Sequence, residues 1–383
     1  MSTSISIKEL KELDPSSYQI VDIRDAVEIS HGAIPGALVM KTEEIETSDA
    51  IDRSKKTIIC CSRGRFSVAA AEELQEKGWD AVSLEGGYIA WLMDVMSAPE
   101  EQDKAADVEK SLRKKFKKSI WSKFTKAINT YELVKPGDKI AVCISGGKDS
   151  MLMAKCFQEL KLHNKFDFEV KFVVMDPGYS PANRQIIEAN AKRMNIPITI
   201  FESDIFDAVF NIEKSPCYLC ARMRRGHLYS KAKELGCNKI ALGHHYDDVI
   251  ETILMGMLYG AQMQTMMPKL HSTNFEGMEL IRPLYLIRED DIKKWRDSND
   301  LHFIQCACKF TDTCSTCGSE NTSKRVEVKN LIRQLKETNP FVESNIFKSV
   351  ENVNLSTVIA YKKDGVKHHF LDDYDRIEKK EEN

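Results

Sequence analysis

The 383-residue sequence has no run of apolar residues that approaches the roughly 18 needed to cross a membrane as a helix. Its first residues, MSTSISIKEL, also lack the charged-then-apolar pattern of an export signal. Both absences predict a cytoplasmic protein without a membrane partner. Because the cytoplasm keeps thiols reduced, we do not expect the eleven cysteines to form disulfides. We interpret them as reactive thiols, metal ligands or core residues.

The sequence also lacks the Walker pattern G-x-x-x-x-G-K-[ST] of common nucleotide-binding loops. Val142 stands where its first glycine is required, and Asp149 follows the lysine in place of serine or threonine. A different segment, SGGKDS at 145–150, follows an apolar run of strand length and precedes a stretch with helical spacing. Its two glycines let the backbone approach an anion, and a following helix N-terminus favours negative charge. We therefore predict a phosphate-binding turn of another type.

The net charge of −3 hides an uneven distribution of charged residues. Residues 1–105 carry 11 basic and 20 acidic side chains, a balance of −9. Residues 106–370 carry 41 basic and 32 acidic side chains, a balance of +9. Positive charge attracts polyanions, so the central block is the candidate for binding nucleic acid, and the acidic N-terminal block is not.

The length, together with 42% hydrophobic residues, predicts two or three domains with sizeable cores. Strand-length apolar runs alternate with helix-like segments in two regions, which indicates an α/β fold in each, the second with a doubly wound parallel sheet. The predicted boundaries are 1–100 for the first domain, 101–130 for a linker and basic helix, 131–345 for the second domain, and 346–383 for a C-terminal hairpin and acidic tail.

One stretch of the basic block has the spacing of an amphipathic helix. Its apolar residues recur every four positions, at Val108, Leu112, Phe116, Ile120, Phe124 and Ile128. Eight lysines and arginines lie between positions 110 and 126. They are either the solvated face of a packing helix or a contact surface for a phosphate backbone. On the second interpretation, the candidate RNA-binding residues are Lys114, Lys115, Lys117 and Lys118.

The SGGKDS segment resembles the PP-loop of the ATP pyrophosphatase superfamily, whose members bind ATP and release pyrophosphate while they adenylate a substrate. The resemblance implies a HUP-type fold and these ATP-binding residues: Ser145, Gly146, Gly147, Lys148, Asp149, Ser150, Asp176 and Gly243. Asp149 and Asp247 are candidate catalytic carboxylates, and Asp248 is a candidate Mg²⁺ ligand. His244 and His245 are equally explained by helix capping or packing.

A narrower resemblance rests on motifs spread over residues 106–345. CYLCARMRRGHLY, GHHYDD and IRPL, followed by a late cysteine motif, resemble the tRNA 2-thiocytidine synthetases. In that family three cysteines hold a [4Fe-4S] cluster with one iron open to a sulfur species, much as a catalytic metal keeps an open position. The resemblance implies that Cys217 and Cys220 are cluster ligands and that Arg224 is a catalytic basic residue near the ATP.

The third cluster ligand has two candidates. TCSTCGSENTSKR matches the family's Cys-x-x-Cys-Gly pattern at Cys314, although no proline precedes it. Cys306 lies directly after an apolar run, where the family's ligand usually sits. We favour Cys314 over Cys306. Alternatively, two C-x-x-C motifs together form a four-cysteine site typical of structural Zn²⁺. These motifs are Cys217 with Cys220 and Cys314 with Cys317.

The N-terminal region resembles a rhodanese domain over nearly all of residues 1–100. The motifs are VDIRDAVEISHGAIPGA, CSRGRFS and LEGGYIAW, in order and at the family's spacing. The resemblance places Cys61 in a loop whose amides stabilise a thiolate or persulfide, with positive charge from Arg63 and Arg65. Cys60 falls one position too early. A related phosphatase would need arginine at position 67, where this sequence has serine, so we do not expect phosphatase activity. Phe66 stands where the rhodanese family often has arginine, so thiosulfate is not an expected donor.

Together these resemblances imply a hypothesis for the whole chain. Cys61 carries persulfide sulfur, and ATP activates the C2 oxygen of a tRNA pyrimidine as an adenylate. Sulfur then displaces AMP. The favoured substrate is a cytidine of the anticodon loop. The expected catalytic residues are Cys61, Asp149, Arg224 and Asp247. The expected partners are tRNA and a cysteine desulfurase or another persulfide or sulfide donor, and a homodimer is compatible with this arrangement. Two alternatives remain open: ATP-dependent sulfur transfer to a small molecule, and a zinc-stabilised persulfide carrier.

Overall fold

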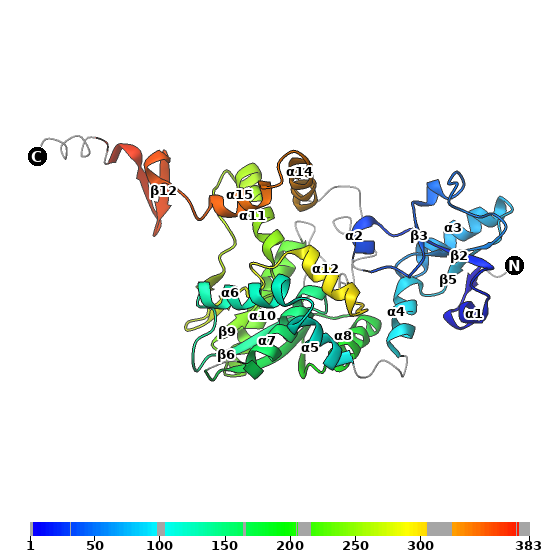
Figure 1. Cartoon of the computed structure of the whole chain (residues 1–383), viewed down its shortest axis with the longest axis horizontal. Coiled ribbons are helices and arrows are strands. Elements are labelled where there is room, and N and C mark those ends of the chain that lie inside the picture. Colours follow the sequence, from blue (N-terminus) through cyan, green and yellow to red (C-terminus); the bar gives the residue numbers. More distant parts are fainter. Residues whose placement is uncertain are drawn as a thin grey trace, which may run out of the picture. The chain divides into compact units, whose positions relative to one another are not determined.

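The structure is a computed structural model that describes residues 3–30, 32–97, 104–163, 166–203, 205, 216–304, 324–372 and 374, without the side chains of Val27, Ser30 and 216–221 (Figure 1). The chain divides into two compact units. The first comprises Met1–Tyr246 and Met267–Glu320, and the second comprises Asp247–Met266 and Asn321–Asn383. Within the described residues, no helix is both long and apolar enough to span a bilayer.

The N-terminal part of the first unit is a parallel five-stranded sheet in the order β1-β5-β4-β2-β3. Its strands are β1 (Ser4–Ile5), β2 (Tyr18–Asp22), β3 (Leu38–Val39), β4 (Lys56–Cys60) and β5 (Ala81–Leu84). Its helices are α1 (Ile7–Glu12), α2 (Ala26–Ser30), α3 (Arg65–Glu76) and α4 (Gly87–Ser97), with a 3₁₀ turn at Thr42–Glu44. Apolar side chains of α3 pack on one face of the sheet, and those of α1 and α4 pack on the other. Both faces of the sheet are covered, and β4 and β5 are accordingly buried along almost their whole length.

The second sheet of this unit has the order β10-β11-β9-β6-β7-β8, and only β10 runs antiparallel to its neighbour. Its strands are β6 (Lys139–Ile144), β7 (Glu169–Asp176), β8 (Ile198–Glu202), β9 (Lys239–Ala241), β10 (Lys269–His271) and β11 (Glu279–Ile281). Helix α10 (Pro216–Glu234) packs on one face, while α7 (Lys148–His163) and α8 (Pro181–Arg193) pack on the other. The sheet is therefore doubly wound, as predicted.

This strand order fixes where a ligand is expected. From β6 the chain proceeds to β7 and β8 on one side, and then crosses to β9 and β11 on the other side of β6. Ligands of open α/β sheets bind outside the carboxyl ends of the strands at such a switch point. The turn 145–150 follows β6 at this position.

The predicted basic helix is not one continuous helix. It consists of α5 (Lys104–Arg113), a π-helical turn (Lys117–Trp121) and α6 (Ser122–Thr130). All six apolar residues at the four-residue spacing are buried. Because an α-helix has about 3.6 residues per turn, that spacing would rotate the apolar stripe steadily around a regular helix. Backbone bonds over five residues, from the amides of Phe116 and Trp121, add residues to the turn and keep the stripe on the core.

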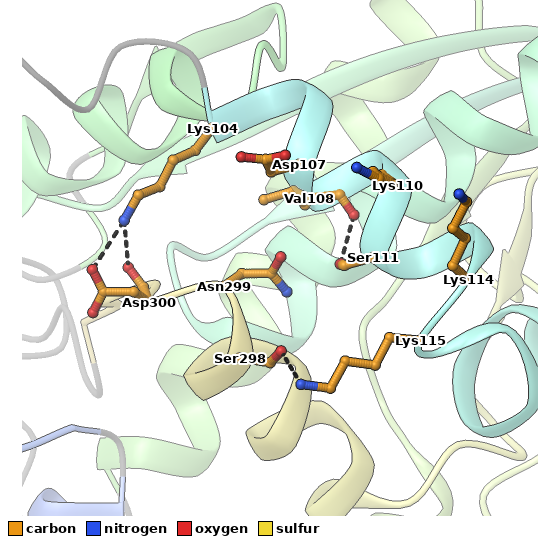
Figure 2. A pocket seen from close by; sticks show the side chains of 10 residues that line it. All are labelled: Lys104, Asp107, Val108, Lys110, Ser111, Lys114, Lys115, Ser298, Asn299 and Asp300. Carbon is orange, nitrogen blue, oxygen red and sulfur yellow. Dashed lines mark hydrogen bonds and ion pairs between the residues drawn. The ribbon is translucent and has the colours of Figure 1, made fainter.

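Helix α5 lies beside the end of α12 (Glu289–Ser298). Lys104 Nζ lies 2.9 Å from Asp300 Oδ2, and Lys115 Nζ donates to Ser298 Oγ at 2.6 Å (Figure 2). The four candidate RNA-binding lysines, Lys114, Lys115, Lys117 and Lys118, are all exposed to solvent.

The second unit is largely helical. It contains most of α11 (Tyr246–Gly260), α14 (Lys324–Thr338), α15 (Val342–Ser349) and a two-stranded hairpin of β12 (Ala360–Lys363) and β13 (Val366–His369). Short 3₁₀ turns lie at Leu355–Thr357 and Phe370–Asp372. Asp364 and Gly365 both have positive φ, 51° and 81°, as a two-residue hairpin turn requires. The hairpin predicted at these two residues is confirmed.

Candidate functional site

The turn 145–150 is held together by its own hydrogen bonds. The amide of Ser145 donates to Ser150 Oγ at 3.2 Å, and Ser150 Oγ donates to the carbonyl of Gly147 at 3.0 Å. Ser150 is buried, whereas Ser145 is exposed. The hydroxyl of Ser150 therefore braces the turn, and that of Ser145 is the one presented at the surface.

Two glycines allow the backbone to approach closely at this turn. Gly146 has φ +86°, and a Cβ there would lie 2.6 Å from Cγ1 of Ile187. Gly243, which follows β9, would place a Cβ 3.2 Å from the amide nitrogen of Ser150. The loop after β9 therefore packs directly on the start of α7. This contact brings Ser145, Gly146, Gly147 and Gly243 together at the switch point.

Lys148 is the buried cation of this turn, with 3% of its surface exposed. Its Nζ lies 3.1 Å from Asp149 Oδ2 and 3.2 Å from Glu289 Oε1 at the start of α12. Burial disfavours the charged lysine, but the two carboxylates outweigh this effect and raise the pKa of Lys148. Asp149 also approaches His245, with Nε2 and Oδ1 3.9 Å apart. Lys148 is therefore a fixed positive charge beside the switch point.

The loop after β7 is ordered by Asp176 and contacts Arg224. Asp176 Oδ1 accepts from the amides of Gly178 at 2.9 Å and Tyr179 at 2.6 Å. Nη2 of Arg224, on α10, donates to the hydroxyl of Tyr179 at 3.3 Å. The carboxylate of Asp176 thus positions its own loop, and that loop positions Arg224. Their roles toward ATP stay predictions.

The candidate residues Asp247 and Asp248 belong to the second unit, in the first turn of α11. Oδ1 of Asp248 lies 3.3 Å from Nη1 of Arg325, and Arg325 Nε lies 3.4 Å from Glu251 Oε2. Asp248 of α11 therefore forms an ion pair with Arg325 of α14. Its role as a Mg²⁺ ligand and the catalytic role of Asp247 stay predictions.

The candidate cluster ligands are only partly within the described structure. Cys217 and Cys220 are the second and fifth residues of α10, where the backbone alone is described. Cys306 and Cys314 lie outside the described residues. Their role as cluster ligands stays a prediction.

Cys61 lies in a second turn, between β4 and α3. Its Sγ accepts hydrogen bonds from the amides of Gly64 at 3.1 Å and Ser67 at 3.4 Å. The hydroxyl of Ser67 lies 3.2 Å from the same sulfur and 2.8 Å from the hydroxyl of Ser83. This arrangement of donors stabilises negative charge on a thiolate or a persulfide. Cys60 is the last residue of β4, and its burial, more than the nearby charge of Asp22, raises its pKa.

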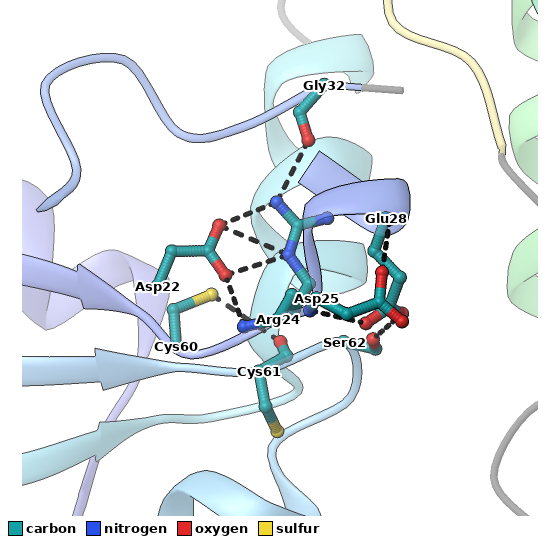
Figure 3. Close-up of polar contacts among 8 residues, drawn as sticks. All are labelled: Asp22, Arg24, Asp25, Glu28, Gly32, Cys60, Cys61 and Ser62. Carbon is teal, nitrogen blue, oxygen red and sulfur yellow. Dashed lines mark hydrogen bonds and ion pairs between the residues drawn. The ribbon is translucent and has the colours of Figure 1, made fainter. Parts of the chain in front are cut away.

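Polar contacts near the Cys61 turn involve α2 and the loop at Gly32 (Figure 3). The carboxylate of Asp22 accepts hydrogen bonds from Nε of Arg24 at 2.9 Å and from its Nη2 at 2.6 Å, and both residues are buried. Nη2 of Arg24 also donates to the carbonyl of Gly32 at 2.9 Å. Ser62 donates to Glu28 on α2. The turn that carries Cys61 is therefore joined to α2 through Ser62, and Arg24 joins the end of β2 to the loop at Gly32.

Comparison with known proteins identifies both halves of the chain. The family model described as PP-loop domain matches residues 114–310, and the one described as rhodanese-like domain matches residues 6–94. The tRNA-cytidine(32) 2-sulfurtransferase of Neisseria meningitidis serogroup C is 35% identical over 230 residues, which are 59% of this chain and 69% of the relative. The chain belongs to the tRNA-cytidine(32) 2-sulfurtransferase family.

Other family members and a solved structure are also similar. The tRNA-cytidine(32) 2-sulfurtransferase of Burkholderia multivorans is 32% identical over 282 residues, 67% of this chain and 82% of the relative. The U34-tRNA thiolase NcsA from Methanococcus maripaludis, solved with its [4Fe-4S] cluster, covers 60% of this chain and 76% of that chain. Its TM-score is 0.47 and its identity 21%, so we transfer no residue role from it. The prediction of a rhodanese-like domain followed by a PP-loop domain is confirmed, and so is the prediction of a sulfurtransferase.

Sequence analysis of this 2-sulfurtransferase family member missed several residues that contact the candidate site. Glu289 pairs with Lys148, Tyr179 contacts Arg224, and Ser83 extends the hydroxyl chain from Cys61 through Ser67. Each comes from an element distant in sequence from the motif that it contacts. One signal was available, because Glu289 stands at the start of an acidic first helical turn that follows the IRPL motif.

Gly87→Ala is expected to lower the free energy of unfolding by roughly 2–4 kcal/mol, because the close contacts cannot relax without moving backbone. A Cβ at Gly87, whose φ is +59°, would lie 2.2 Å from the carbonyl oxygen of Cys61 and 2.7 Å from the amide of Gly64. Gly78→Ala is the matched control, since Gly78 has φ +84° and nothing within 4 Å, and it should cost about 1 kcal/mol. Urea denaturation of the full chain measures both. Equal losses for the two variants would contradict the steric argument.

Proposed function

We propose that this member of the family thiolates tRNA in an ATP-dependent reaction, at C2 of a cytidine in the anticodon loop. The curated relatives are named for tRNA cytidine 32, and this shared name supports the substrate class. The observation that carries the proposal is the turn 145–150 at the switch point of a doubly wound sheet, with Lys148 buried beside it. A buried cation and a helix N-terminus at that place favour a bound polyphosphate.

In the first step, the O2 atom of the base attacks the α-phosphorus of ATP, and pyrophosphate leaves. Lys148 and the turn 145–150 stabilise the charge that develops on the leaving pyrophosphate. Two carboxylates, on Asp149 and Glu289, already surround Lys148, so the phosphates enter more favourably with Mg²⁺ bound. Asp248 is the candidate carboxylate ligand of that ion. The base is left as an adenylate, whose AMP is a better leaving group than the original carbonyl oxygen.

In the second step, sulfur at the oxidation level of sulfide attacks C2, and AMP leaves. We propose that Cys61 supplies this sulfur, which it receives as persulfide from a cysteine desulfurase or another donor. The donors at Gly64 and Ser67 hold the negative charge on the terminal sulfur. Because persulfide sulfur lies two electrons above sulfide, release from Cys61 also requires a thiol reductant, which is oxidised to a disulfide.

Cys217, Cys220 and Cys314, with Cys306 as the alternative to Cys314, are the proposed ligands of a [4Fe-4S] cluster. The cluster, when bound, supplies an open iron position that can hold sulfur. Cys217 and Cys220 are the second and fifth residues of α10, so the helix backbone keeps these two ligands within about one turn of each other. Iron and sulfide analysis after anaerobic purification tests this assignment. Stoichiometric Zn²⁺ without iron would instead support the closed four-cysteine site.

Mass spectrometry of tRNA nucleosides tests the proposed function. In a strain that lacks this protein, 2-thiocytidine is expected to be lost from tRNA, and the wild-type gene should restore it. A gene that encodes Lys148→Ala should not restore it, because ATP activation fails. Unchanged 2-thiocytidine in the deletion strain would refute tRNA cytidine as the substrate.

A further inference from the structure

A pocket of about 500 Å³ lies between α5 and the carboxyl end of α12 (Figure 2). Four lysines line it, which are Lys104, Lys110, Lys114 and Lys115. Ser298, Asn299 and Asp300 line the opposite wall. The lysine side chains reach the pocket from α5 and from the turn that follows it.

The lysines of the pocket differ in how their charge is compensated. Lys104 pairs with Asp300, and Lys115 donates to the hydroxyl of Ser298. Lys110 and Lys114 form no ion pair within the described part of the chain, and both are exposed. They are four residues apart, and the amide of Lys114, just after α5, donates to the carbonyl of Lys110 at 3.0 Å. At this helical spacing like charges are neighbours and repel each other. An anion between them would relieve this repulsion.

Two ion pairs, each with one fully buried partner on α7, fix the helix that presents these lysines. Lys155 Nζ, fully buried on α7, lies 2.8 Å from Glu109 Oε1 on α5. One turn further along both helices, Arg113 Nε lies 3.3 Å from Glu159 Oε2, and Glu159 is also fully buried. Removing one partner of a buried ion pair is costly, so α5 is held firmly on α7.

Both walls of the pocket connect to the turn 145–150. Helix α7, on which α5 is docked, begins at Lys148. Helix α12, which forms the other wall, begins at Glu289, the ion-pair partner of Lys148. The ten residues of α12 span about 15 Å, so the pocket lies roughly one helix length from the ATP turn. A long substrate could therefore contact both places at once.

We propose that this pocket binds a phosphodiester group of the tRNA backbone, between Lys110 and Lys114. The proposal rests on the proposed function, since it assumes a tRNA substrate. Two observations favour a nucleic acid over a small free anion. Both lysines are exposed and so accessible to a large ligand, and Asp107 and Asp300 in the same pocket reduce its balance of charge to +2. A small anion would gain little there, but a polyanion is attracted by the flanking Lys117 and Lys118 as well.

The test measures binding of an unmodified tRNA transcript to the full chain over a series of salt concentrations. For Lys110→Ala/Lys114→Ala, we expect the dissociation constant at low salt to rise about tenfold. The slope of its logarithm against the logarithm of salt concentration should fall by roughly one, as for one lost phosphate contact. Lys8→Ala/Lys41→Ala removes the same charge from exposed positions of the N-terminal domain and should change neither quantity.

A gain of binding provides the second arm, because a misfolded variant cannot produce it. Asp107→Asn removes a carboxylate from the pocket and should lower the dissociation constant for tRNA about threefold at low salt. Ethylation of individual tRNA phosphates should identify one position that weakens binding to the wild type and has no effect on the double variant.

The outcomes separate the pocket from the proposed function. If the double variant binds tRNA with the wild-type slope while both proteins thiolate it, the pocket assignment is wrong and the function stands. If the wild type neither binds nor thiolates tRNA, the function fails and the assignment with it. If titration shows that inorganic pyrophosphate binds the wild type but not the double variant, and tRNA binding is equal, the pocket holds a free anion and the proposal is overturned.

Discussion

Lys148→Ala is expected to reduce pyrophosphate release in the presence of tRNA by roughly 100- to 1000-fold, the usual effect of removing a charge that stabilises a transition state. Lys148 is the buried cation at the switch point. In the proposed reaction, charge develops there on the leaving pyrophosphate. Because this charge grows as the bond to the α-phosphorus breaks, the loss should fall mainly on kcat. A steady-state assay of pyrophosphate release over a range of ATP concentrations separates kcat from KM.

Lys161→Ala is the matched control, because it removes a lysine from the same helix at an exposed position. Lys161 pairs with Asp167 at 3.0 Å, a surface ion pair worth about 0–1 kcal/mol, so the rate should stay within about twofold of the wild type. Lys148→Ala leaves Asp149 and Glu289 without their cation, so its melting temperature is measured in parallel. A folded Lys148→Ala variant with the wild-type rate would place the ATP site elsewhere.

The positions of the turn 145–150 and of the turn that carries Cys61 were both predictable, because each turn is encoded in a few neighbouring residues. Gly146 needs its positive φ, and the amides that contact Cys61 lie within six residues of it. The signal is therefore local, and the α/β class follows from the alternation of strands and helices around it. The same holds for the hairpin turn at Asp364 and Gly365.

The contacts that complete these sites were not predictable, because the fold brings them together. Glu289 reaches Lys148 only after α12 is placed beside the start of α7, and Ser83 reaches Ser67 through the pairing of β5 with β4. The break in the basic helix was not predictable for a different reason. A four-residue spacing fits an α-helix over two turns, but over more turns the apolar side chains would rotate away from the core. A π turn corrects this rotation, and no single residue in the sequence marks its position.

Cys61→Ala is expected to abolish persulfide formation on the N-terminal domain, a loss of at least about 1000-fold. Cys60, the other thiol among residues 1–100, is fully buried and has a raised pKa, so we do not expect it to act as the sulfur nucleophile. Cys60→Ala is a close control, since it removes the adjacent thiol. Cys60 is fully buried in β4 and burial raises its pKa, so its loss should cost about 1 kcal/mol of stability and leave sulfur loading intact. Mass spectrometry of the chain after incubation with a cysteine desulfurase and cysteine measures the added sulfur on each variant.

Comparing two sulfur donors then tests whether Cys61 passes sulfur on to tRNA or whether the N-terminal domain is dispensable for thiolation. With the desulfurase as donor, Cys61→Ala should thiolate tRNA far more slowly than the wild type. With free sulfide, which needs neither a persulfide carrier nor a reductant, both proteins should react at similar rates, because the ATP turn is unchanged by the substitution. Equal rates with both donors would mean that sulfur reaches the base without Cys61. Loss of activity with both donors would instead show that Cys61 supports the fold or a step other than sulfur delivery.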